Sequence, residues 1–145
     1  MRILIDTNVL IDVIARREPF FANAVKVFEI CQRETVEGCI AAHSVVDMVY
    51  ILRKNFTANE LREILLRLCK IFVVEAIDMS KLIAALNNRD FSDFEDCLQT
   101  QCALSLHADY IVTRNVKDFA VSEIPAVTPE EFFKILEEQE CLPTS

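Results

Sequence analysis

The chain has 145 residues, 52% of them hydrophobic, which is enough for one domain with one core. Its 15 basic and 23 acidic residues give a net charge of −8, which argues against a general DNA-binding module but not against a nuclease with acids around a metal. Gly38 is the only glycine, so glycine-rich phosphate-binding loops are excluded.

Cysteine usage and hydropathy point to a cytoplasmic protein. The six cysteines have no C-x-x-C spacing, and we expect small buried thiols in a reducing compartment rather than a zinc site. We find no secretory signal and no apolar run of the ~20 residues that a membrane helix needs. We therefore expect no membrane association.

Strands and helices are predicted to alternate along the chain. Short apolar or β-branched runs predict strands at 2–5, 39–42, 71–74 and 110–113, and a possible short fifth strand at 126–127. Helical spacing of apolar residues predicts helices at about 9–15, 20–34, 44–54, 58–70, 78–88, 92–107 and 130–138. This order predicts an α/β/α sandwich with a mainly parallel sheet of four to five strands. Residues 1–138 form the domain, and 139–145 are expected to fray.

Several polar residues are predicted to mark element ends. Thr57 and Glu60 have the spacing of a capping box, and Thr128 followed by proline and two glutamates predicts a helix start. Ser44 is expected to cap the helix after the second strand. Gly38 is expected to end the connection that precedes that strand.

The first strand runs directly into a carboxylate, Asp6, followed by Thr7 and Asn8. One interpretation is a helix N-cap, because all three residue types cap helices well. The other is a functional acid, because open α/β sheets bind ligands at the carboxyl ends of their strands. The first strand alone leaves both open.

Three further carboxylates are predicted to reach the same edge of the sheet. Asp47 lies one turn into the helix after strand two, Asp118 lies just beyond strand four, and Asp96 lies near the start of the long helix before strand four. Each has a plainer interpretation: a surface acid for Asp47, a loop acid for Asp118, and a favourable helix dipole for the segment 90–96. Yet Asp93 and Asp96 are one turn apart, where like charges repel. Converging carboxylates without an arginine between them predict an Mg²⁺ or Mn²⁺ site.

The motifs together resemble those of a known family. Residues 5–10 (IDTNVL), 44–54 (SVVDMVYILRK), 93–99 (DFEDCLQ), 113–119 (TRNVKDF) and 128–132 (TPEEF) are similar, in order and spacing, to the motifs of PIN domains. The similarity is greatest to small single-domain toxin ribonucleases of the VapC type and covers nearly the whole chain. It implies a PIN-like fold and an Mg²⁺- or Mn²⁺-dependent endoribonuclease, the toxin of a toxin–antitoxin pair.

Carried over by position, the resemblance implies that Asp6, Asp47, Asp96 and Asp118 are the catalytic and metal-binding acids. The supporting residues are Thr7, Asn8, Asp93, Thr113 and Asn115. Two departures bear on activity: the family usually has glutamate where Asp47 stands, and often aspartate where Asn115 stands. A catalytically inactive PIN module that binds RNA or protein is therefore the alternative.

The sequence also suggests partners. Arg114 and Lys117 flank the predicted site and are expected to hold RNA phosphates. A small antitoxin is expected to insert a basic residue among the acids and to lay an apolar helix on residues 20–34 and 44–69, and the resemblance also implies a homodimer. Two other enzyme classes fit poorly: Asn8 replaces the second aspartate of haloacid-dehalogenase-type phosphatases, and response-regulator receivers need an acid pair after strand one.

Overall fold

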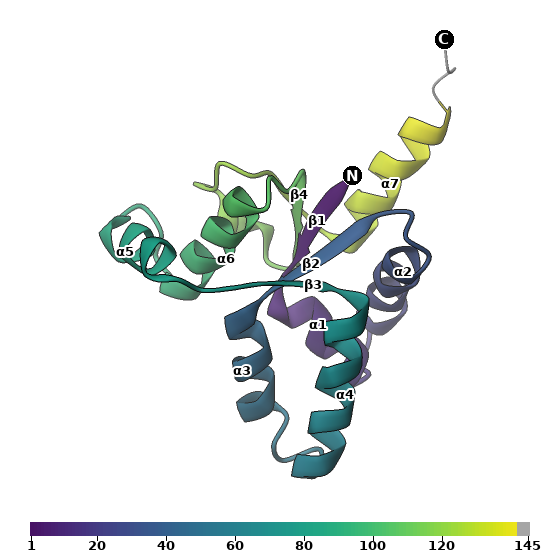
Figure 1. Cartoon of the computed structure of the whole chain (residues 1–145). Helices are drawn as coiled ribbons and strands as arrows, with labels where there is room; N and C mark the ends of the chain where they lie inside the picture. Colours follow the sequence, from purple (N-terminus) through teal and green to yellow (C-terminus); the bar gives the residue numbers. More distant parts are fainter. Residues whose placement is uncertain (142–145) are drawn as a thin grey trace.

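A computed structural model describes residues 1–141 of the chain, and the end of the expected tail, residues 142–145, lies outside it. Five parallel strands form one sheet in the order β3-β2-β1-β4-β5 (Figure 1). The strands are β1 (Arg2–Ile5), β2 (Glu37–Ala41), β3 (Val73–Glu75), β4 (Tyr110–Val112) and β5 (Ala126–Val127). The predicted α/β/α fold with a parallel sheet is confirmed.

Seven α-helices and one 3₁₀ turn connect the strands in the described residues. They are α1 (Thr7–Ile14), α2 (Phe21–Gln32), α3 (Ala42–Ile51), α4 (Ala58–Ile71), α5 (Met79–Asn87), α6 (Phe94–Ser105), the turn η1 (Val116–Phe119) and α7 (Pro129–Cys141). Helix α7 extends three residues into the segment that was expected to fray.

The alternation of side chains along β1 divides the core into two layers. Ile3 and Ile5 are fully buried in a cluster with residues of α1, α2, α3, α4 and α7. Leu4 is buried in a cluster on the other face with residues of α6 and η1. Figure 1 shows α5 and α6 on one side of the sheet and α1, α2 and α4 on the other. A strand apolar on both faces is the pattern of a central parallel strand.

Two predictions about element ends, the capping box and the helix start after Thr128, are confirmed, and two are wrong. Thr57 and Glu60 form the capping box, with both reciprocal hydrogen bonds present. Gly38 does not end the connection but lies within β2, where a Cβ atom would come within 2.6 Å of Cys31 Sγ, so only glycine fits beneath α2. Ser44 does not cap α3, because the helix begins two residues earlier, after Ala41.

The cysteines largely follow expectation. Cys31, Cys39, Cys97 and Cys102 are buried free thiols, whereas Cys69 on α4 is exposed. Burial raises the pKa of the Cys31 and Cys102 thiols to about 12, which keeps them protonated at neutral pH.

Strand order determines where a ligand can bind. The chain moves outward from β1 to β2 and β3, then returns to β4 on the other side of β1, so the carboxyl end of β1 is a topological switch point. The Asp6 N–H donates to Val112 O at 2.9 Å, which ties the end of β1 to the end of β4. The residues that follow β1, β2 and β4 therefore meet in one crevice.

The hairpin of α3 and α4 projects from the sheet as a two-helix arm (Figure 1). Its outer surface carries apolar side chains: Val46, Val49, Tyr50, Ile51 and Leu66 are between 41% and 69% exposed. Phe28, which lies in the segment 20–34 where a partner was expected to dock, is instead part of the core. Within residues 1–141, none of the helices has the length and hydropathy to cross a membrane.

Candidate active site

All four predicted acids line one cavity of about 320 Å³ at the carboxyl end of β1, hereafter the acidic cleft. The cleft lies where the topology predicts a ligand site. Its lining residues are Asp6, Thr7, Asn8, Ile11, Arg17, Asp47, Ile51, Asp93, Glu95, Asp96, Gln99, Asn115 and Asp118. Residues up to 112 positions apart in the sequence thus share one site.

Asp6 is the most firmly held of these acids. Only 7% of the residue is exposed. The Thr113 hydroxyl donates to its Oδ2 at 2.8 Å, and the Thr7 N–H donates to its Oδ1 at 2.8 Å. Asp6 is thus both the N-cap residue of α1 and a member of the acidic cleft, so the two interpretations of the opening motif are compatible. Burial raises the pKa of Asp6, and the charge of Asp118 raises it further.

A buried amide that the sequence did not identify supports the floor of the cleft. Gln99 Nε2 lies 2.9 Å from Ser44 Oγ, 3.2 Å from Thr7 Oγ1 and 3.4 Å from Asp6 Oδ1. The Thr7 and Ser44 hydroxyls are also 2.8 Å apart. This network links α1, α3 and α6 beneath Asp6. A polar stripe of residues 93, 96 and 99, at helical spacing on α6, was the available sequence clue.

The cleft concentrates like charge. Loss of hydration raises the pKa of Asp96 to about 7, and the charges of Asp93 and Asp6 contribute to the same shift. Glu95 also has a pKa of about 7, raised by loss of hydration and by the neighbouring Asp47. Glu95 was not among the predicted site residues, although it lies in the DFEDCLQ motif. The carboxylates thus raise one another's pKa in addition to the effect of burial.

Asp93 has a structural role that the sequence left open. It is the N-cap of α6, and its Oδ1 accepts from Glu95 N at 2.8 Å and from Asp96 N at 3.2 Å. These bonds fix the first turn of the helix and thereby the positions of the Glu95 and Asp96 side chains on the cleft wall.

The donor set fits a divalent cation in its chemistry. Carboxylate oxygens are the ligands that Mg²⁺ and Mn²⁺ prefer, and the pKa values of Asp6, Asp96 and Glu95 are raised first by burial and then by neighbouring carboxylates. Among residues 1–141, however, the side chains of no three His, Cys, Asp or Glu residues converge closely enough to form a ready-made metal site.

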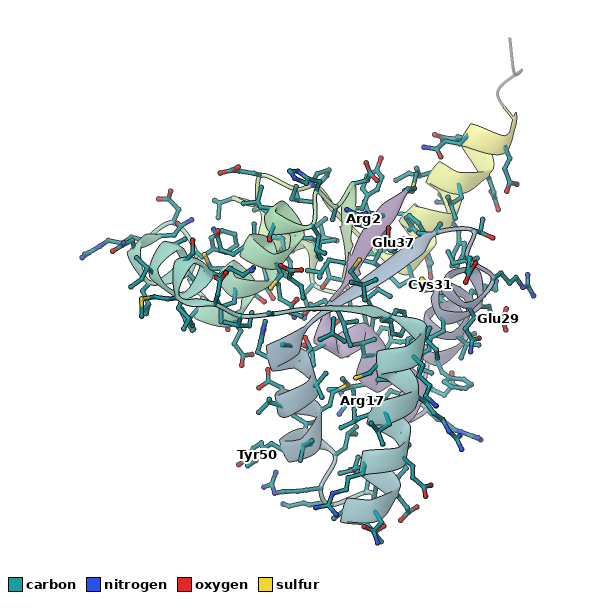
Figure 2. The ribbon with its side chains drawn as sticks, viewed as in Figure 1. Arg2, Arg17, Glu29, Cys31, Glu37 and Tyr50 are labelled. Carbon is teal, nitrogen blue, oxygen red and sulfur yellow. The ribbon has the colours of Figure 1, made fainter. Side chains whose placement is uncertain are left out.

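The predicted RNA-binding cations are not in the cleft. The Arg114 side chain lies outside it, paired with the buried Asp12 and placed over the ring of Phe20. Lys117 is exposed on η1 and does not line the cleft. Arg17, just beyond α1, is the basic residue that does line it (Figure 2). Its place in an irregular loop left no sequence pattern from which to predict it.

Two comparisons with known proteins give matches to this chain. The family model described as the PIN domain matches residues 2–117. A search of curated proteins finds no match.

Solved structures with the same fold include toxin–antitoxin proteins. A toxin–antitoxin complex from Klebsiella pneumoniae is 24% identical, with a TM-score of 0.65, and the match covers 87% of this chain and 96% of that one. VapBC2 from Rickettsia felis, bound to a DNA fragment from its promoter, is 14% identical with a TM-score of 0.66, covering 88% and 98%. FitAcB from Neisseria gonorrhoeae is 16% identical with a TM-score of 0.64, also covering 88% and 98%.

Proposed function

Because this chain belongs to the PIN domain family, we propose that it is an Mg²⁺- or Mn²⁺-dependent endoribonuclease and the toxin of a toxin–antitoxin pair. One observation carries the proposal: four carboxylates from separate elements line a single cleft at the switch point of the sheet. A divalent cation held by these carboxylates would supply Lewis-acid chemistry for a phosphoryl oxygen and for the attacking water.

The residues of the chain have distinct parts in this proposal. Asp6, held by Thr113 and the α1 N-terminus, is the fixed ligand, and Asp96 and Asp118 complete the ligand set with Asp47. Asp47 is one methylene shorter than the glutamate usual in the family. Arg17 is placed to hold a phosphate of the substrate against the acids. We expect water to be the nucleophile and the product to carry a 5′-phosphate.

An RNA cleavage assay tests this proposal. Single-stranded and structured RNAs are incubated with the full chain in Mg²⁺ or Mn²⁺ and, in parallel, in EDTA. We expect internal cleavage only with the cation. Equal cleavage in EDTA would contradict the metal mechanism.

One observation favours a second candidate, an inactive PIN module that binds RNA or protein. The carboxylates of residues 1–141 are not arranged as a ready-made metal site, and Asp47 replaces the usual glutamate. RNA binding that neither Mn²⁺ nor EDTA alters, together with cleavage of no RNA, would select this candidate.

The toxin assignment implies a small inhibitory partner. The α3–α4 arm has an apolar groove of about 320 Å³ that includes Val49, Phe56, Leu61 and Leu65, suited to an amphipathic helix. A partner arginine reaching the acidic cleft would compete with the cation. Co-purification with the product of the adjacent gene, followed by an arginine-to-alanine scan of that partner, tests this; unchanged Mn²⁺ affinity in the complex would contradict it. We also propose, from the family resemblance, that the chain forms a homodimer. Analytical sedimentation of the full chain tests this directly.

A further inference from the structure

We propose that a second cavity, next to the acidic cleft, binds a nucleobase of the RNA substrate; this inference rests on the proposed ribonuclease function. The cavity, hereafter the stacking pocket, has a volume of about 260 Å³ and is formed by α1, α2 and the start of α7. Its lining includes Asp12, Phe20, Asn23, Arg114, Thr128 and Glu130.

The stacking pocket has a planar wall. Arg114 Cζ lies 4.1 Å from the centroid of the Phe20 ring, and Phe20 is still 40% exposed. An aromatic ring and a guanidinium plane are the two surfaces on which unpaired bases stack in RNA-binding proteins. An ion pair with Asp12 holds the guanidinium group of Arg114 in position, with Nε 2.6 Å from Asp12 Oδ2.

The pocket also contains buried hydrogen-bonding capacity that the protein does not use. Asp12 is only 1% exposed; its Oδ2 faces Arg114 Nε at 2.6 Å, whereas its Oδ1 has no hydrogen-bond partner among the described residues. An unsatisfied buried acceptor is costly, so a donor group from a ligand is favoured there. At the rim, Asn23 Nδ2 donates to Glu130 Oε1 at 2.9 Å, which leaves further acceptor oxygens facing the pocket.

This chemistry distinguishes a base from a phosphate. Two carboxylates, Asp12 and Glu130, line the stacking pocket and would repel a phosphate, whereas they would accept hydrogen bonds from the exocyclic amino groups of guanine, adenine and cytosine, which uracil lacks. We therefore expect amino-bearing bases to bind better than uracil.

The stacking pocket and the acidic cleft are close enough for one RNA strand to occupy both. Ile11 lines the cleft and the next residue, Asp12, lines the pocket; likewise Asn115 lines the cleft and Arg114 the pocket. The backbone N–H of Arg114 also donates to Asn8 Oδ1 at the cleft wall, with 3.4 Å between nitrogen and oxygen. A base in the pocket would thus place a neighbouring phosphate at the acids.

The absence of tryptophan from the chain permits a direct binding test. In a Phe20→Trp variant of the full chain the single indole forms the pocket wall, and its fluorescence is titrated in EDTA with GMP, AMP, CMP, UMP and ribose 5-phosphate. We expect quenching by the amino-bearing nucleotides, weaker quenching by UMP, and none by ribose 5-phosphate. Quenching by ribose 5-phosphate equal to that by the nucleotides, or no quenching by any nucleotide, would overturn the proposal.

A kinetic test uses Phe20→Leu, which keeps apolar volume but removes the ring. Stacking of one base on an aromatic residue contributes about 1–3 kcal/mol to the binding free energy. We therefore expect KM for a short single-stranded RNA to rise about tenfold, with kcat and Mn²⁺ affinity unchanged. The matched control is Tyr50→Leu, which removes an exposed ring that also carries an arginine, Arg53, at 3.8 Å but lies outside the pocket (Figure 2); its KM should not change.

The two tests separate the pocket from the ribonuclease itself. Base binding in EDTA without cleavage in Mg²⁺ or Mn²⁺ would sustain the pocket and overturn the function. Normal cleavage by Phe20→Leu would overturn the pocket alone. If Phe20→Leu instead abolishes binding of a partner protein and nucleotides do not bind the wild-type chain, the pocket belongs to a protein interface and the proposal is wrong. Circular dichroism verifies that each variant is folded. Quenching of a 2-aminopurine-labelled RNA by the wild-type chain measures base stacking without any substitution.

Discussion

Asp6 and Asp12 lie at opposite ends of α1, and both are buried carboxylates with pKa values raised by burial. Their neighbours differ. Asp12 has cations beside it: Arg114 at 2.6 Å, and Arg17 also lowers its pKa. Asp6 has Asp118 beside it, which raises its pKa against a smaller opposing effect of Arg114, and its hydrogen bonds come from neutral groups of Thr113, Thr7 and Gln99.

The difference shows how burial alone fails to identify a functional acid. A buried carboxylate with a matched guanidinium is compensated within the protein and contributes to positioning. A buried carboxylate among other carboxylates is uncompensated and is favoured to acquire a cation from solution. The contrast therefore predicts that substitution of Asp6 lowers activity without lowering stability, whereas loss of the partner of Asp12 lowers stability.

The largest expected effect is on activity. If Asp6 is the fixed metal ligand that we propose, Asp6→Asn should reduce metal-dependent RNA cleavage by at least about a thousandfold. The free energy of unfolding of the metal-free protein should stay equal or rise, because repulsion between carboxylates is relieved. Initial rates with Mn²⁺ and urea denaturation in EDTA measure both. A purely capping role predicts full activity instead, because asparagine caps as well as aspartate.

The second effect is on stability. Arg114→Gln leaves the Asp12 charge buried without its partner, and we expect a loss of about 2 kcal/mol at pH 8, below the 3–5 kcal/mol typical of deeply buried pairs because the Arg114 side chain is 24% exposed. Protonation of Asp12 removes the unpaired charge, so the loss should shrink by pH 5. Denaturation of variant and wild type at both pH values tests this; a loss independent of pH would show that packing, not charge, is responsible.

The third effect is the pH dependence of the metal-free wild type. The folded-state pKa of Asp96 is about 7, above its unfolded value, so the folded state binds more protons than the unfolded state between about pH 4 and 7. Stability in EDTA should therefore fall as pH rises from 5 to 8. Thermal denaturation across this range measures it, and the slope should be smaller in Asp96→Asn. An equal slope in the variant would locate the titrating group elsewhere.

The smallest effect concerns the network beneath Asp6. Ser44→Ala removes the closest partner of Gln99 Nε2, which keeps its longer contacts with Thr7 and Asp6. We expect a loss of about 1 kcal/mol in the free energy of unfolding. A control, Ser92→Ala, changes an exposed serine outside the network and should have little effect. Equal losses in the two variants would contradict a role for the network.

The sequence predicted the sheet and the gathering of the four acids because strand patterns and parallel topology place strand ends together. It did not predict the network of Ser44 and Gln99, since a buried polar contact between α3 and α6 depends on how the helices pack. It also placed Arg114 at the acids, because spacing gives the position of a long side chain but not the carboxylate it pairs with. Asp12 was not predicted as its partner, because it lies within an apolar helix pattern and only the packing brings the two side chains together.

Calorimetric titration of Mn²⁺ into the metal-free chain tests the central claim most directly, with Asp6→Asn and Asp12→Asn as the paired variants. The account predicts that the wild type and Asp12→Asn bind Mn²⁺ at the acidic cleft and that Asp6→Asn binds at least about tenfold more weakly, a difference of about 1.4 kcal/mol. Equal Mn²⁺ affinity in Asp6→Asn and wild type, or no binding by the wild type, would contradict it.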